Sequence, residues 1–127
     1  MALEKNFENK IKNYLKEHNC WYVKYFANRM TRVGVPDILA CVNGFFVAIE
    51  VKAPNGKPSD LQLWNREQIR NAGGISIVLY PNQWNDFETL IHDLLEFPQH
   101  INTIRTEQRT FDTRWLNASF TFKNWNI

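Results

Sequence analysis

Three side chains in the first half of the sequence have the types needed for chemistry on a phosphate ester: Asp37, Glu50 and Lys52. Carboxylates are hard oxygen ligands that suit Mg²⁺. A bound metal lowers the pKa of its water and neutralises phosphoryl oxygens, and a nearby lysine could orient or help to deprotonate the attacking water. These residues can do this chemistry only if the fold brings them together.

An Asn-Gly dipeptide at 43–44 predicts a hairpin between the segments that carry these residues. Apolar residues dominate the flanking segments, at about 36–42 and 45–52. Asn-Gly between apolar segments is the strongest short hairpin signal, because both turn residues need a positive φ. Alternating residues of the two segments are apolar and should face the core: Ile38, Ala40, Val42, Phe45, Val47, Ile49 and Val51.

The length of this turn sets the register of the predicted hairpin. A two-residue loop places Val42 opposite Phe45, and the same register places Asp37 directly opposite Glu50. Directly opposed residues share a face, with Cβ atoms about 4.5–5.5 Å apart, and Lys52 shares that face because side chains alternate along a strand. The pairing predicts one cluster of two carboxylates and an ammonium group.

Two carboxylates placed opposite each other repel, so this cluster needs a compensating cation. Lys52 alone could supply it, and a divalent metal would do so better. The alternative is a surface ion network with Lys52 between two acids, because surface ion pairs are common and weak. Pro36 favours the metal site, since its fixed φ delivers Asp37 into the strand rigidly.

Hydrophobic periodicity and turn residues predict the remaining elements. The sequence indicates a helix at about 4–18, a strand at 20–26, a helix from Ser59 or Asp60 to about 72, a strand at 75–80 and a helix at 83–96. The apolar stripe of the first helix comprises Leu3, Phe7, Ile11, Tyr14 and Leu15. The order α-β-β-β-α-β, with a further helix and an aromatic-rich tail, predicts an α/β fold with a mixed central sheet.

Length and composition favour one domain at residues 1–97 and a C-terminal extension at 98–127. A chain of 127 residues with 44% hydrophobic and 22% charged residues suits a single core. The extension is too apolar for a disordered tail, and 118–125 could form a strand or pack on a partner subunit. No apolar stretch is long enough to cross a bilayer and no signal peptide is evident, so we expect a cytoplasmic protein.

Charge near the N-terminus provides candidates for binding nucleic acid. Residues 1–32 carry seven Lys/Arg and three Glu, a net charge of +4, whereas 33–127 carry eight Lys/Arg and ten Asp/Glu, a net charge of −2. A basic segment could follow a phosphate backbone, and a solvated helix face explains it equally well. The candidate phosphate contacts are Lys24, Arg29 and Arg32.

The predicted first strand and hairpin also carry aromatic residues and thiols. We expect the aromatic side chains to lie mostly in the core, with one or two able to stack on bases: Trp21, Tyr22, Tyr25 and Phe26. Cys20 and Cys41 are expected as free thiols in buried strands, because disulfides are rare in the cytosol.

The residues around the predicted cluster resemble a nuclease signature. Pro36-Asp37 followed by Glu50-Val51-Lys52 resembles the PD-(D/E)xK motif, and the order α-β-β-β-α-β matches the core of that superfamily. Three flanking segments are similar to the virus-type replication-repair nuclease (VRR-NUC) domain in its stand-alone phage form: Gly34-Val35, Ala53-Pro54 and Ser59-Asp60-Leu61-Gln62. The resemblance covers roughly residues 4–90.

This resemblance implies which residues hold the metal. Mg²⁺ or Mn²⁺ would be bound by Asp37, Glu50, the backbone carbonyl of Val51 and a glutamate of the first helix. Glu4 and Glu8 both lie beside the inward stripe of that helix, and Glu8 better fits the family's spacing to the first strand. We therefore expect Glu8 to join the metal, directly or through water.

The resemblance also implies a function. It predicts a metal-dependent endonuclease that hydrolyses branched DNA such as Holliday junctions, working as a homodimer without a nucleotide cofactor in a phage-infected or bacterial cytoplasm. Gln62 would lie by the active site, with Arg66 where related nucleases often carry Tyr. Two alternatives stay open: a catalytically silent DNA-binding module on a nuclease fold, and a sequence-specific restriction-like endonuclease.

The aromatic-rich extension generates a test of the expected homodimer. If residues 98–127 build the subunit interface, removing everything after Pro98 turns a dimer into a monomer. Light scattering gives the mass of the full and truncated chains under the same conditions. A truncated chain that keeps the dimer mass would rule out an interface in this segment.

Overall fold

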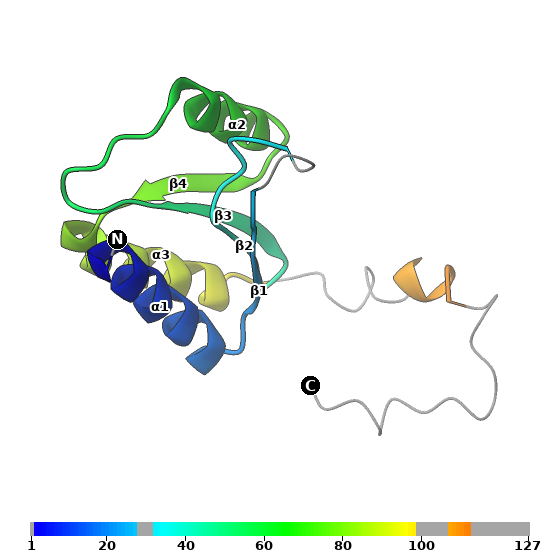
Figure 1. Cartoon of the computed structure of the whole chain (residues 1–127). Helices are drawn as coiled ribbons and strands as arrows, with labels where there is room; N and C mark the ends of the chain where they lie inside the picture. The colour runs from blue at the N-terminus through cyan, green and yellow to red at the C-terminus, as the bar shows by residue number, and fades with distance from the viewer. Residues whose placement is uncertain (1, 28–31, 99–106, 113–127) are drawn as a thin grey trace. The chain divides into compact units, whose positions relative to one another are not determined.

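A computed structural model of the chain describes residues 2–27, 32–98 and 107–112 (Figure 1). The chain divides into two compact units, Met1–Phe97 and Pro98–Ile127. Within the second unit, 107–112 form a helical turn in which the Thr110 amide donates to the Glu107 carbonyl at 3.2 Å. The strand expected at 118–125 lies outside the described residues.

The first unit is a mixed α/β fold. Its elements are α1 (Ala2–Glu17), β1 (Trp21–Lys24), β2 (Ile38–Val42), β3 (Phe45–Val51), α2 (Asp60–Asn71), β4 (Ile75–Leu79), the 3₁₀ turn η1 (Pro81–Gln83) and α3 (Trp84–Glu96). The strands form a sheet in the order β1-β2-β3-β4, antiparallel except for the parallel pair β3–β4. The predicted element order and mixed sheet are confirmed. None of the described helices is both long and apolar enough to cross a membrane.

Helices cover the two faces of this sheet unequally. Figure 1 shows α1 and α3 together on one face, and α2 lying over β4 on the other. The core fills the α1/α3 side and includes the predicted inward residues of the hairpin except Phe45, which is partly buried and packs against the core. Its members are Phe7, Ile11, Leu15, Cys20, Ile38, Ala40, Val42, Val47, Ile49, Val51, Leu79, Phe87, Ile91 and Leu94. The residues that alternate with these along β2 and β3 therefore point to the α2 side.

The hairpin has the predicted register. Val42 pairs with Phe45, and the ladder runs in that register to the pair Ile38–Ile49. Asn43 and Gly44 adopt positive φ values of 49° and 88°, as a two-residue turn of this type requires. The side-chain nitrogen of Asn43, Nδ2, also donates to the Leu94 carbonyl at 2.8 Å. The turn thus satisfies a carbonyl at the C-terminal end of α3.

The predicted start of the second strand at residue 36 is wrong. β2 begins at Ile38, so Asp37 lies just outside the ladder. The physical reason is that the Asp37 side chain takes over the backbone pairing: its Oδ2 accepts from the Val51 amide at 2.8 Å. The Asp37 side chain thus binds β3 at Val51, the neighbour of Glu50, and no backbone pair joins Asp37 to Glu50 in the ladder.

Several side chains that were expected in the core are exposed. Leu3 is exposed in the first turn of α1, and Trp21 is 64% and Phe26 72% exposed. Trp21 pairs with Cys41, and both are exposed on the sheet face away from α1 and α3. The reason is that α2 lies over β4 and leaves the β1 side of that face open.

The predicted burial of the thiols is half right. Cys20 is buried and Cys41 is exposed, and both are free. Cys20 precedes β1 rather than lying in it, whereas Cys41 lies in β2. Alternation along β2 turns Cys41 away from the core that Ala40 and Val42 enter.

Gly34 brings the loop before Asp37 into contact with α2. Its φ is +82°, and a Cβ built there would lie 2.6 Å from Leu61 Cγ and 2.9 Å from Asn65 Nδ2. Asn65 is buried and donates to the Leu61 carbonyl at 3.0 Å and the Val33 carbonyl at 3.5 Å. This close approach clamps the segment that leads into Asp37 against the helix that carries Gln62.

Replacement of Gly34 by alanine tests this clamp. We expect Gly34→Ala to lower the free energy of unfolding by about 2–4 kcal/mol, because it adds both a left-handed backbone strain and a steric overlap. Gly73→Ala is the matched control: its φ is +94° but nothing lies within 4 Å of the new Cβ. The control should lose only about 1 kcal/mol. Equal losses for the two variants in urea denaturation would contradict the clamp.

Candidate active site

Asp37 stands at the end of the sheet, where it contacts both neighbouring strands. Its Oδ2 accepts from the Val51 amide of β3 at 2.8 Å, and its backbone carbonyl accepts from the Tyr25 amide beyond β1 at 2.8 Å. Pro36 before it is buried. The carboxylate is therefore held firmly, while further lone pairs stay available, because a carboxylate offers about four acceptor sites.

Glu50 is the most deeply buried acid of the cluster around Asp37, at 5% exposure. Its Oε2 accepts from Gln62 Nε2 at 3.0 Å and lies 3.5 Å from Lys52 Nζ. Its Oε1 is buried and has no hydrogen-bond partner among the described residues. A buried carboxylate oxygen without a donor is costly. This atom is therefore a ready ligand for a cation.

The protonation of Glu50 reflects this environment. Burial of the carboxyl, the negative charge of Asp37 and a hydrogen bond that protonated Glu50 shares with Asp37 raise the pKa of Glu50 to about 7, although Lys52 acts in the opposite direction. The ammonium of Lys52 thus compensates the paired acids only in part. A second positive charge at Glu50 Oε1 would complete the compensation.

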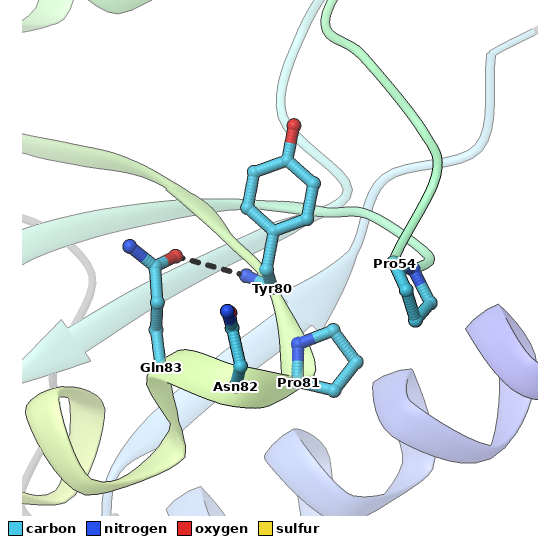
Figure 2. A pocket seen from close by; sticks show the side chains of 5 residues that line it. All are labelled: Pro54, Tyr80, Pro81, Asn82 and Gln83. Atoms are coloured by element: carbon cyan, nitrogen blue, oxygen red, sulfur yellow. Dashed lines mark hydrogen bonds between the residues drawn. The ribbon is translucent and has the colours of Figure 1, made fainter.

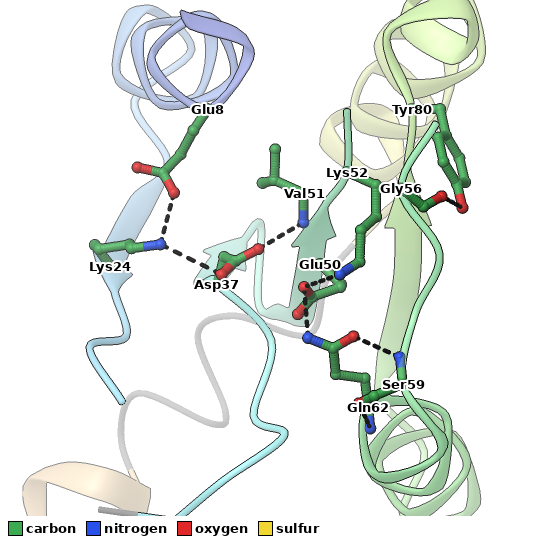
Figure 3. Close-up of polar contacts among 10 residues, drawn as sticks. All are labelled: Glu8, Lys24, Asp37, Glu50, Val51, Lys52, Gly56, Ser59, Gln62 and Tyr80. Atoms are coloured by element: carbon green, nitrogen blue, oxygen red, sulfur yellow. Dashed lines mark hydrogen bonds and ion pairs between the residues drawn. The ribbon is translucent and has the colours of Figure 1, made fainter. Parts of the chain in front are cut away.

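Lys52 is positioned by its strand and by the following loop. Its backbone amide donates to the Leu79 carbonyl of β4 at 3.1 Å. The loop at 53–58 packs on its side chain, since a Cβ at Gly56 would lie 3.3 Å from Lys52 Cδ. Tyr80 Oη donates to the Gly56 carbonyl at 2.8 Å (Figure 3). Tyr80 thereby holds the loop that confines Lys52.

Tyr80 also lines a pocket of about 380 Å³ (Figure 2). Its lining consists of Pro54, Tyr80, Pro81, Asn82 and Gln83. Within it, Gln83 Oε1 accepts from the Tyr80 amide at 3.2 Å. No carboxylate lines this pocket, so it lacks the ligands that a hard cation requires. Asp37 and Glu50 offer such ligands instead.

Gln62 serves both its helix and the site. Its side-chain Oε1 accepts from the Ser59 backbone amide at 2.8 Å, and its backbone amide donates to Ser59 Oγ at 3.2 Å. These two bonds complete a capping box at the start of α2. The side-chain nitrogen, Nε2, donates to Glu50. The capping box fixes the Gln62 side chain, and this side chain in turn orients the Glu50 carboxylate.

Glu8, and not Glu4, points toward the cluster. Glu8 is buried, and its Oε1 accepts from Lys24 Nζ at 2.6 Å. Lys24 Nζ also reaches Asp37 Oδ1 at 3.3 Å, so the ammonium lies between the two carboxylates (Figure 3). Burial acts to raise the pKa of Glu8, but Lys24 and Lys12 outweigh it, and the pKa lies below its ordinary value. Lys24, expected at a phosphate, is bound to acids.

Of the two arginines expected to contact phosphates, the structure describes only one. Arg29 lies outside the described residues. Arg32 is exposed, its guanidinium lies 5.6 Å from the centre of the Trp64 ring, and its carbonyl accepts from Tyr25 Oη at 2.6 Å. Arg32 thus stays a candidate phosphate contact beside α2.

The donor set suits one divalent cation between Asp37 and Glu50. Two carboxylates converge there, and the free Glu50 Oε1 has the chemistry of a metal ligand. Across the described ranges, however, no three His, Cys, Asp or Glu side chains form a metal-binding group. Glu8 is separated from Asp37 by the Lys24 ammonium. The Val51 carbonyl stays a prediction as a ligand.

Sequence reasoning missed two positioning residues, Tyr80 and Asn65, and did not connect Ser59 with Gln62. The Ser-x-x-Gln spacing of a capping box could have assigned Ser59 and Gln62 to each other. No local pattern announces the contact of Tyr80 with Gly56 or of Asn65 with Val33, because 24 and 32 residues separate these pairs. Both contacts steady loops that flank the site.

Comparison with known proteins adds no relative. The sequence matches no protein-family model and no curated protein. The resemblance to PD-(D/E)xK nucleases therefore depends on the motif residues themselves.

The raised pKa of Glu50 predicts how stability depends on pH. The folded protein keeps a proton on Glu50 that the unfolded chain releases above its ordinary pKa of 4.5. This contribution to stability is present at low pH and is lost as the pH rises through about 7. In EDTA, Glu50→Gln should therefore be more stable than the wild type at pH 8, by about 1–3 kcal/mol, and the difference should shrink toward pH 5.

Urea denaturation at both pH values measures this difference. Glu67→Gln is the control, because Glu67 is an exposed acid on α2. The stability difference between Glu50→Gln and the wild type should change more between pH 5 and pH 8 than that of this control. A Glu50→Gln difference that is the same at pH 5 and pH 8 would show that Glu50 titrates normally.

Proposed function

We propose that this chain is a divalent-metal-dependent endonuclease that hydrolyses phosphodiester bonds in DNA, with a PD-(D/E)xK site. One observation carries the proposal: Glu50 is 5% exposed, its Oε1 has no hydrogen-bond partner among the described residues, and it faces a second carboxylate, Asp37. A purely structural ion pair gains nothing from burying repelling acids. A site that takes a cation and a phosphate does.

Each residue of the site has a distinct task in this mechanism. Mg²⁺ or Mn²⁺ bound by Asp37 and Glu50 would lower the pKa of its water and neutralise phosphoryl charge. Lys52, 3.5 Å from Glu50 Oε2, orients or helps to deprotonate the attacking water. Gln62 keeps the Glu50 carboxylate in place, and the Val51 amide does the same for Asp37.

The form of the DNA follows from the resemblance to stand-alone VRR-NUC domains. It favours branched DNA, such as a Holliday junction, cut by a homodimer in which each subunit supplies one site. Arg32, exposed beside Trp64, supports contact with the phosphate backbone.

A panel of DNA substrates tests the activity. The protein is incubated with a four-way junction, a flap, a linear duplex and a single strand, each with Mg²⁺, Mn²⁺ or EDTA. We expect metal-dependent cleavage that is strongest on the junction, as paired symmetric nicks. Binding to the junction that persists in EDTA, without cleavage under either metal, would instead favour a silent binding module.

Conservative substitutions test the site itself. Asp37→Asn, Glu50→Gln and Lys52→Met should each lower the rate of cleavage by about 100-fold or more, because each removes a charge that acts at the reacting phosphate. Glu67→Gln, a change of one exposed acid on α2, should cut DNA at the wild-type rate. Wild-type rates in all three site variants would refute the assignment.

A further inference from the structure

Lys24 and Glu50 approach Asp37 from opposite faces of the sheet. Lys24 pairs with Ile38, whose side chain enters the core, so Lys24 emerges on the face that α1 covers. Glu50 follows Ile49 in β3 and therefore emerges on the face of α2, where Gln62 meets it. Asp37 lies at the sheet end between these faces. The site thus has two compartments that share one carboxylate.

The compartment on the α1 side is already filled by ammonium groups. Lys24 Nζ lies 2.6 Å from Glu8 Oε1 and 3.3 Å from Asp37 Oδ1. Lys12 Nζ lies 3.3 Å from the other Glu8 oxygen. Both oxygens of Glu8 therefore have a charged partner, unlike Glu50 Oε1 in the other compartment.

The charges of the whole cluster support the same division. Two of the three ammonium groups in the cluster, those of Lys12 and Lys24, contact Glu8. Among the described residues, Lys24 also contacts Asp37, whereas Glu50 has only Lys52. A divalent ion between Glu8 and Asp37 would have to displace Lys24 from both acids and lie beside its charge. Repulsion between like charges a few ångströms apart opposes this.

We propose that Lys24 fills the second cation position of this site, so that the chain binds a single divalent ion at Asp37 and Glu50. Glu8 is then a positioning residue that holds Lys24 and does not bind the metal. This inference rests on the proposed function for the identity of the site as a divalent-metal site. It assigns to a side chain the place that a second metal occupies in two-metal phosphoryl-transfer sites.

Mn²⁺ binding without DNA tests this inference directly. The loss of the free Mn²⁺ signal in electron paramagnetic resonance counts the ions bound per chain. We expect one Mn²⁺ for the wild type and for Glu8→Gln, with dissociation constants within about three-fold, whereas Asp37→Asn weakens binding by about ten-fold or more. Two bound Mn²⁺ in the wild type, or a loss in Glu8→Gln as large as in Asp37→Asn, would overturn it.

Removal of the Lys24 charge gives a second test. Lys24→Met should tighten Mn²⁺ binding by about five-fold, because a positive charge beside Asp37 is lost. Lys12→Met is the matched control, since Lys12 also contacts Glu8 and its side chain is 23% exposed against 22% for Lys24. It should change binding by less than about two-fold. Equal effects of the two variants would overturn the special place of Lys24.

A replacement variant guards against misfolding, and the combined results of Mn²⁺ binding and DNA cleavage separate this inference from the proposed function. Lys24→Gln, a neutral variant that keeps a hydrogen-bond donor for Glu8, replaces Lys24→Met if the latter does not fold, with the same expected tightening. A wild type that binds one Mn²⁺ in this pattern but cuts no DNA contradicts the proposed function and leaves this inference standing. A wild type that cuts DNA but binds two Mn²⁺ supports the proposed function and overturns this inference. A wild type that binds no Mn²⁺ also overturns the inference.

Discussion

The burial of the Glu50 carboxyl beside Asp37 is the constraint on which the rest of the site depends. Two acids in this position repel, and burial removes the water that would screen them. The surrounding residues place donors at only one oxygen of Glu50. Gln62 and Lys52 both contact Oε2, and Oε1 has no hydrogen-bond partner among the described residues. A pKa near 7 expresses the charge that remains uncompensated.

The supporting structure keeps these groups from relaxing away from one another. The capping box fixes Gln62 at the start of α2, and Gly34 locks the approach to Asp37 against the same helix. Tyr80 holds the loop that packs on Lys52. Preorganised groups of this kind lose little further freedom when a substrate binds, which is the general advantage of a rigid site.

The sheet separates two different environments within the cluster. On the α1 face an ammonium group, Lys24, joins Glu8 to Asp37, and on the α2 face Glu50 offers an oxygen that no described residue contacts. The difference originates in the alternation of side chains along the strands. Lys24 pairs with Ile38 and shares its face, whereas Glu50 follows Ile49 and lies on the opposite face.

The sequence by itself determined the features that depend on neighbours along the chain. Asn43-Gly44 predicted the turn and its register, alternation predicted the buried face of the hairpin, and the order of elements followed from periodicity. Only the tertiary structure decided the contacts between distant segments, such as Lys24 with Glu8 and Gly34 with α2. It also decided the exposure of Trp21, because α2 lies over β4 at the other edge of the sheet. Such contacts depend on how helices pack on the sheet, and no local pattern encodes that packing.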